Sequence, residues 1–170
     1  LPALKAKVSG TIGINAAHIG GFAWGDWSLT KPGYLTFDFT KWKEAVDLGD
    51  IGRLSRIVIH EFTHIFNADR DSNPKYWTEF QGLAAKQEVF SSYAGRNNLE
   101  TLPEVVGYYV ARCAKDNPYD TGQFNDYYEW VKTTIFAGRE FGPAPGTKAT
   151  CDVTQEQIPT PSPSVPDWVR

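Results

Sequence analysis

The chain has 170 residues, of which 41% are hydrophobic and 22% are charged, and its formal net charge at pH 7 is −3. This length and composition predict one soluble globular domain with a buried core. The slight negative charge and a pI of about 5.6 argue against nucleic acid or an anionic membrane as the main partner. No stretch approaches the roughly 18 apolar residues of a membrane span, so none is expected. We expect the chain to act as a monomer.

The first forty residues read as strands and turns. Strands are predicted over residues 8–15 and 22–27, and residues 34–39 alternate apolar and polar side chains, as is typical of a half-buried strand. Thr40 is a suitable N-cap for a short helix over residues 41–48. These elements predict a small N-terminal β-sheet.

The middle of the chain reads as a mainly helical body. Asp50 can cap a helix in which apolar residues recur at helical spacing, namely Ile51, Leu54, Ile57, Val58, Phe62, Ile65 and Phe66. Further helices are predicted over residues 77–90, 102–113 and 124–137, and a loop over residues 91–98. The order of these elements predicts an α+β fold: a small sheet followed by helices.

The C-terminal segment has a different composition. Residues 159–166 are rich in Pro and Ser, which is typical of an extended linker. We therefore expect one domain over residues 1–150 and a tail over residues 151–170.

Residues 60–64 read His-Glu-Phe-Thr-His, an H-E-x-x-H motif that uses two of only three histidines. Residues four apart share one face of a helix, so His60 and His64 can bind one metal ion. Glu61 is then placed to take a proton from a metal-activated water, as a general base. Two surface histidines on an ordinary helix are the alternative, which the rarity of the pattern disfavours.

Two histidines do not complete a catalytic zinc site, which takes three protein ligands and leaves one position for water. Metzincins have a third histidine six residues after the second, but Arg70 stands there. The third ligand must then be a downstream carboxylate. The candidates are Glu79, Glu88, Glu100 and Glu104. Their spacing slightly favours the last two, which follow a loop at the start of a helix.

A segment downstream of the motif resembles a known family. Residues 92–104 place Tyr93 seven residues before Glu100, and Glu104 four residues after it. The same spacing of a tyrosine, a liganding glutamate and a further glutamate occurs in the lethal-factor-like zinc metallopeptidases. This family includes the catalytic domain of anthrax lethal factor and the secreted Pro-Pro endopeptidases. The resemblance covers about residues 51–111.

The resemblance implies a zincin-like fold and one Zn²⁺ per chain. It implies His60, His64 and Glu100 as zinc ligands. It also implies Glu61 as the general base and Tyr93 as the hydrogen-bond donor to the transition state.

Pro103 departs from the family pattern, because proline fits only the first turn of a helix. Thr101 and Glu104 form a T-x-x-E capping box, which would start the helix at Leu102 and leave Glu100 just outside it. Glu104 therefore stays open as an alternative ligand. If it is not a ligand, it can hold a histidine ring by its second nitrogen.

Cys113 and Cys151 are the only cysteines, and neither belongs to a C-x-x-C motif, so no cysteine zinc site is expected. A disulfide between them would contribute about 3–4 kcal/mol and imply an oxidising compartment. Two buried free thiols are the alternative. We expect a disulfide and a secreted or extracellular protein.

These features predict that residues 1–150 form a zinc metalloendopeptidase domain that hydrolyses peptide or protein substrates. The resemblance raises proline-containing peptides as one option. The main alternative is a catalytically silent binding module with a peptidase fold, on a secreted or surface protein. The intact Glu61 argues against it, because a binding module has no use for a base between two ligands. A metallohydrolase acting on a non-peptide bond is a third reading.

Overall fold

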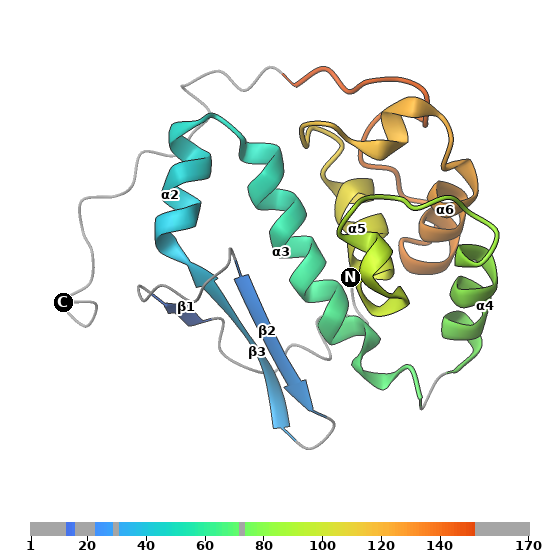
Figure 1. Cartoon of the computed structure of the whole chain (residues 1–170), viewed down its shortest axis with the longest axis horizontal. Helices are drawn as coiled ribbons and strands as arrows, with labels where there is room; N and C mark the ends of the chain where they lie inside the picture. Colours follow the sequence, from blue (N-terminus) through green and yellow to red (C-terminus); the bar gives the residue numbers. More distant parts are fainter. Residues whose placement is uncertain (1–12, 16–22, 29–30, 72–73, 152–170) are drawn as a thin grey trace.

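The structure is a computed structural model that describes residues 13–15, 23–28, 31–71 and 74–151 (Figure 1). Side chains are described from Trp42 onward, except those of Ile51 and Asp69. The strands are β1 (Gly13–Asn15), β2 (Ala23–Ser28) and β3 (Lys31–Asp38). The helices are α2 (Phe39–Asp47), α3 (Ile51–Phe66), α4 (Pro74–Ala84), α5 (Asn98–Val110) and α6 (Asn125–Trp130). Short helical turns are η1 (Asn67–Asp69), η2 (Ala94–Arg96), η3 (Pro118–Thr121) and η4 (Val131–Ile135).

The expectation of an α+β, zincin-like fold with a small N-terminal sheet is wrong. From residue 42 to residue 151 the described chain is mostly helical and contains no strand. The backbone of β3 pairs in parallel with β1 and antiparallel with β2, before this body begins. Among the side chains that the structure describes, helices and their connecting loops supply every member of both buried clusters, so the packed body is helical.

Helix α3 lies at the centre of the arrangement in Figure 1, between α2 and the strands on one side and α5 on the other. It begins where the sequence predicts, because the carboxylate of Asp50 accepts a hydrogen bond from the backbone N–H of Arg53 at 3.1 Å. It ends at Phe66, where Asn67 continues the chain into η1. The predicted helix that carries the two histidines is confirmed.

The start of α5 differs from the prediction. The helix begins at Asn98 rather than Leu102, because the side chain of Asn97 caps it by accepting from the N–H of Glu100 at 3.1 Å. Thr101 does not act as the cap; its hydroxyl donates to two preceding backbone carbonyls, at 2.8 and 3.0 Å. Glu100 therefore lies in the first turn of the helix and not outside it.

Pro103 is accommodated inside α5. A proline in a helix interior removes one backbone hydrogen bond and costs roughly 3 kcal/mol. Its neighbours Leu102, Val105 and Val106 are almost completely buried, so the packing of the helix offsets this cost.

Two other helices are shorter than predicted. Helix α4 ends at Ala84, and residues 85–93 form turns and a loop instead of continuing the helix. Helix α6 ends at Trp130 and continues as the wider turn η4. Among the described residues, no helix is both long enough and apolar enough to cross a bilayer.

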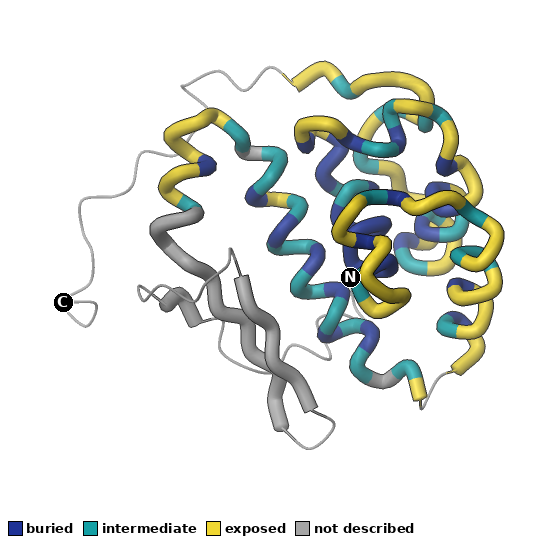
Figure 2. Tube along the Cα trace, in the orientation of Figure 1, coloured by how far each residue is buried: buried dark blue, intermediate teal, exposed yellow. Residues whose placement is uncertain are grey.

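An aromatic core holds α4, α5 and α6 together. Its fully buried members include Phe80, Tyr109, Tyr119, Tyr127 and Tyr128. Many of their rings pack edge to face, as between Tyr119 and Tyr128, whose centroids are 5.5 Å apart. Figure 2 shows buried residues concentrated on α5, which packs between this core and α3.

Helices α3 and α5 approach closely at Gly107. A Cβ atom on this residue would lie 3.1 Å from the backbone oxygen of Arg56 and 3.7 Å from Cβ of His60. A side chain here would crowd the backbone of Arg56 and force a small local shift. The glycine therefore sets the distance between the helix of the two histidines and the helix of Glu100 and Glu104.

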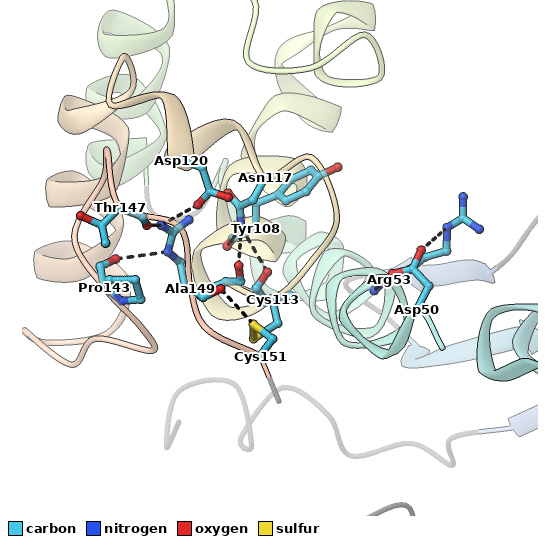
Figure 3. Close-up of a disulfide and its surroundings, with 12 residues drawn as sticks. Asp50, Arg53, Tyr108, Cys113, Asn117, Asp120, Pro143, Thr147, Ala149 and Cys151 are labelled. Atoms are coloured by element: carbon cyan, nitrogen blue, oxygen red, sulfur yellow. Dashed lines mark hydrogen bonds and ion pairs between the residues drawn. A yellow bond between two sulfur atoms is a disulfide. The ribbon is translucent and has the colours of Figure 1, made fainter. Parts of the chain in front are cut away.

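A disulfide joins Cys113 to Cys151, with Cα atoms 5.7 Å apart, as the sequence analysis expects (Figure 3). The segment before Cys151 is also held by the buried side chain of Arg112, which donates to the carbonyls of Pro143 and Thr147 and pairs with Asp120. The disulfide and the arginine together fix this segment to the end of α5.

Candidate metal centre

His60 and His64 direct the same ring nitrogen to one point. Both lie on the face of α3 that meets α5, and their Nε2 atoms are 3.2 Å apart. The rings stand edge to face, with centroids 4.9 Å apart. Their four-residue spacing requires that they share a face of the helix, and that face packs against α5.

Glu100 completes the group from α5. Its Oε2 atom lies 3.3 Å from Nε2 of His60 and 3.4 Å from Nε2 of His64. The three atoms thus form a nearly equilateral triangle. Three ligands of a tetrahedral zinc ion, at metal distances of roughly 2.0–2.2 Å, are about 3.3 Å from one another. The three residues are close enough to bind a metal ion.

The Oε2 atom of Glu100 is buried and makes no hydrogen bond of good geometry with any residue that the structure describes. A buried carboxylate oxygen without a hydrogen-bond donor is costly, and a cation between it and the imidazoles would remove that cost. This observation, with a donor set of two imidazoles and one carboxylate, fits a metal ion.

The electrostatics of the group keep its atoms available to a cation. The contact with His60 lowers the pKa of Glu100 despite its partial burial, so the carboxylate stays ionised. Burial, together with the charge of His60, lowers the pKa of His64 to about 4, so its ring is neutral at physiological pH.

Glu104 forms a hydrogen bond with the other ring nitrogen of His60, Nδ1. Its Oε1 atom lies 3.0 Å from Nδ1 of that ring, and it also accepts hydrogen bonds from Arg56 and Ser91. Burial opposes the charge on Glu104, but these donors and the positive charge of Arg56 still lower its pKa. An ionised carboxylate only accepts hydrogen bonds, so Nδ1 of His60 carries the proton and Nε2 presents a lone pair to the triangle.

Burial lowers the pKa of His60, whereas its contacts with Glu100 and Glu104 raise it, and the net shift is upward. The two acidic residues thus favour a proton on His60, whereas burial favours the neutral ring of His64. The structure brings Glu100, and not Glu104, to the two Nε2 atoms.

A pocket of about 320 Å³ lies beside His60, and both predicted catalytic residues line it. Glu61 follows His60 on α3. Tyr93 belongs to the loop before α5; its ring centroid is 5.6 Å from that of His60 and it is 39% exposed. The guanidinium of Arg96 lies over the ring of Tyr93, 4.2 Å from its centroid.

The remaining candidates of the sequence analysis lie elsewhere. Glu79 and Glu88 are exposed and belong to no metal-binding group among the described residues. Sequence reasoning did not single out Arg56 and Ser91. Arg56 stands one turn before His60, so helical spacing could have placed it on the same face. Ser91 gives no signal in the sequence, because only the tertiary structure brings it to Glu104.

No family model, no characterised protein and no solved structure matches the chain. The resemblance to lethal-factor-like peptidases thus rests on residues 60–64 and on the spacing of Tyr93, Glu100 and Glu104.

Proposed function

We propose that this protein is a secreted zinc-dependent endopeptidase in which His60, His64 and Glu100 bind the metal. The observation that carries the proposal is the triangle of three ligand atoms, 3.2–3.4 Å on a side, next to a pocket that Glu61 and Tyr93 line. A metal site alone would suit many functions. A glutamate between the two histidines and a phenol beside them are groups that hydrolysis needs.

Zinc is the metal that this donor set fits best. Two imidazoles and one carboxylate are a common catalytic zinc set, and three protein ligands leave a fourth position for water or substrate. Bound there, zinc would supply Lewis acidity, which polarises a peptide carbonyl and acidifies a water molecule.

Glu61 acts as the general base in this proposal. It lies next to His60 and lines the same pocket, so its carboxylate can accept a proton from the attacking water. The same carboxyl then gives the proton to the departing amine, which allows the peptide bond to break.

Tyr93 donates a hydrogen bond to the carbonyl oxygen as negative charge builds on it. Burial and the nearby charge of Glu100 raise the pKa of Tyr93, so the phenol keeps its proton at neutral pH and remains a donor. The stacked Arg96 holds the ring near the edge of the pocket. A positioned donor of this kind contributes about 3–4 kcal/mol to the transition state.

The disulfide between Cys113 and Cys151 supports the secreted location, because such bonds persist mainly in oxidising compartments. The substrate is a peptide or protein, and the family resemblance adds proline-containing sequences to the candidates.

The test combines metal analysis with cleavage of a peptide library. We expect one zinc per chain by elemental analysis and defined cleavage sites by mass spectrometry, both lost after treatment with a chelator and restored by zinc. Zinc binding without any cleavage would support a silent binding module and overturn the peptidase. Cleavage that survives complete removal of metal would overturn the metal-dependent mechanism.

A further inference from the structure

Three donors from two parts of the chain, helix α3 and the loop before η2, converge on the carboxylate of Glu104. Arg56 from α3 reaches Oε1 with a guanidinium nitrogen at 2.5 Å, and Nδ1 of His60 reaches the same oxygen at 3.0 Å. Ser91, from the loop before η2, donates to Oε2 at 2.9 Å. Glu104 is only 2% exposed, so these contacts replace water around a buried charge.

This arrangement fixes the orientation of the carboxylate. Oε1 accepts hydrogen bonds from Arg56 and His60, and Oε2 accepts one from Ser91. Rotation of the carboxylate would therefore break hydrogen bonds at both oxygens. Arg56 also compensates the charge of Glu104, which would otherwise be strongly unfavourable in this buried position.

Arg56 and Ser91, the two donors other than His60, each make a second contact. The guanidinium of Arg56 lies over the ring of Tyr108 at 4.9 Å, and the backbone of Arg56 packs against Gly107. The hydroxyl oxygen of Ser91 accepts a hydrogen bond from the N–H of Ala94 at 3.0 Å. The side chains of Arg56 and Ser91 are therefore each held by one further contact besides the hydrogen bond to Glu104.

We propose that Arg56 and Ser91 are positioning residues for the metal centre. They act through Glu104, which holds the proton of His60 on Nδ1 and turns Nε2 toward His64 and Glu100. The inference deepens the proposed function and rests on its metal site, but it does not require that the bound metal cleave peptides. Carboxylates that orient a liganding histidine commonly contribute 10- to 100-fold to metal affinity.

The first test measures zinc affinity by competition with a chromophoric chelator. We expect Arg56→Met and Ser91→Ala each to weaken zinc binding by about 10-fold or more. Arg56→Lys should recover part of the loss, because it keeps the charge but not the planar stacking on Tyr108. Arg53→Met, at a half-buried arginine that pairs with Asp50, and Ser55→Ala, at an exposed position of α3, are the matched controls and should bind zinc as tightly as the wild type.

The second test observes the ring of His60 in the metal-free protein by ¹⁵N NMR, at a pH high enough that the spectrum shows a neutral imidazole. The wild type should show the proton on Nδ1, and Glu104→Gln and Arg56→Met should reduce that population. A double-mutant cycle adds a further check: Ser91→Ala should cost much less zinc affinity in the Glu104→Gln background than in the wild type.

The outcomes separate the two proposals. Zinc affinity unchanged by Arg56→Met and Ser91→Ala would overturn the positioning role, even if the wild type proves to be a peptidase. Additive effects in the cycle would overturn the route through Glu104. If Arg56→Met does not fold, Arg56→Lys and Ser91→Ala still decide. If the wild type binds no zinc, the proposed function fails, and the NMR measurement alone decides whether Arg56 orients His60.

Discussion

Glu100 and Glu104 lie one helical turn apart on α5 and approach opposite nitrogens of the same ring. Oε2 of Glu100 is 3.3 Å from Nε2 of His60, and Oε1 of Glu104 is 3.0 Å from Nδ1. One imidazole is thus held between two carboxylates of different surroundings. Glu104 is buried among donors, whereas Glu100 has a buried oxygen that faces both histidines. The first arrangement suits orientation of the ring, and the second suits a metal ligand.

Replacement of Glu61 separates metal binding from catalysis. Glu61→Gln should retain one zinc per chain, because Glu61 is not part of the ligand triangle. Without a base to accept the proton, turnover should fall at least 100-fold. Elemental analysis and peptide cleavage measure the two effects on the same sample. Wild-type turnover in this variant would disprove the assigned mechanism.

Tyr93→Phe removes one hydroxyl from the edge of the pocket. If the hydroxyl donates only in the transition state, kcat should fall by about 100- to 1000-fold, with little change in KM and none in zinc content. Steady-state kinetics on a peptide from the library give both constants. An unchanged kcat would remove Tyr93 from the site, and a raised KM alone would make it a substrate contact.

Glu100→Gln tests the third ligand. An amide oxygen is a much poorer zinc ligand than a carboxylate, so the variant should lose most of its zinc during dialysis against a weak chelator. Glu79→Gln is the matched control, since Glu79 is exposed on α4 and should have no effect. Full zinc retention by Glu100→Gln would show that another residue completes the site.

The disulfide is expected to stabilise the fold without shaping the metal centre. The bond closes a loop with a sequence separation of 38, for which chain entropy gives about 3–4 kcal/mol. Cys113→Ser/Cys151→Ser should therefore lower the free energy of unfolding in urea by that amount while the zinc content stays at one. A loss of zinc under folded conditions would mean that the loop also supports the site.

The aromatic core should make the protein sensitive to alkali. Burial raises the pKa of Tyr127 to about 12 and that of Tyr119 well above its usual value. In the unfolded chain these phenols ionise near pH 10, so above that pH the unfolded state holds fewer protons than the folded state. The stabilisation is complete below about pH 10 and is lost as the pH rises toward about 12. Tyrosinate absorbance should rise together with loss of helical circular dichroism; ionisation of all tyrosines near pH 10 in a protein that stays helical would contradict this.

Local sequence signals predicted the central helix but not the fold around it. Asp50 and the apolar spacing after it place α3 correctly, because capping and helical periodicity depend on residues a few positions apart. The alternation in residues 34–39 suggested that a sheet is part of the domain. Periodicity in one segment cannot show which segments share a core, and the described core is helical.

The T-x-x-E pattern at Thr101 predicted the wrong start of α5 for a similar reason. It is a valid local signal, but Asn97 offers a competing cap four residues earlier, and only the packing of α5 decides between them. That choice moved Glu100 into the first turn of the helix, where it faces the histidines.

The sequence by itself determined that His60 and His64 share a face, because a helix repeats every 3.6 residues and their spacing is fixed by covalent structure. It also limited the third group to a few downstream carboxylates. Only the tertiary structure decided which of these carboxylates lies beside the two histidines. The close approach of α3 and α5 at Gly107 brings Glu100 to the Nε2 atoms, and Glu104, with Arg56 and Ser91, to the far side of His60. Contacts between residues as distant in the sequence as His60 and Glu104, 44 positions apart, depend on the packing of whole helices, which no local pattern encodes.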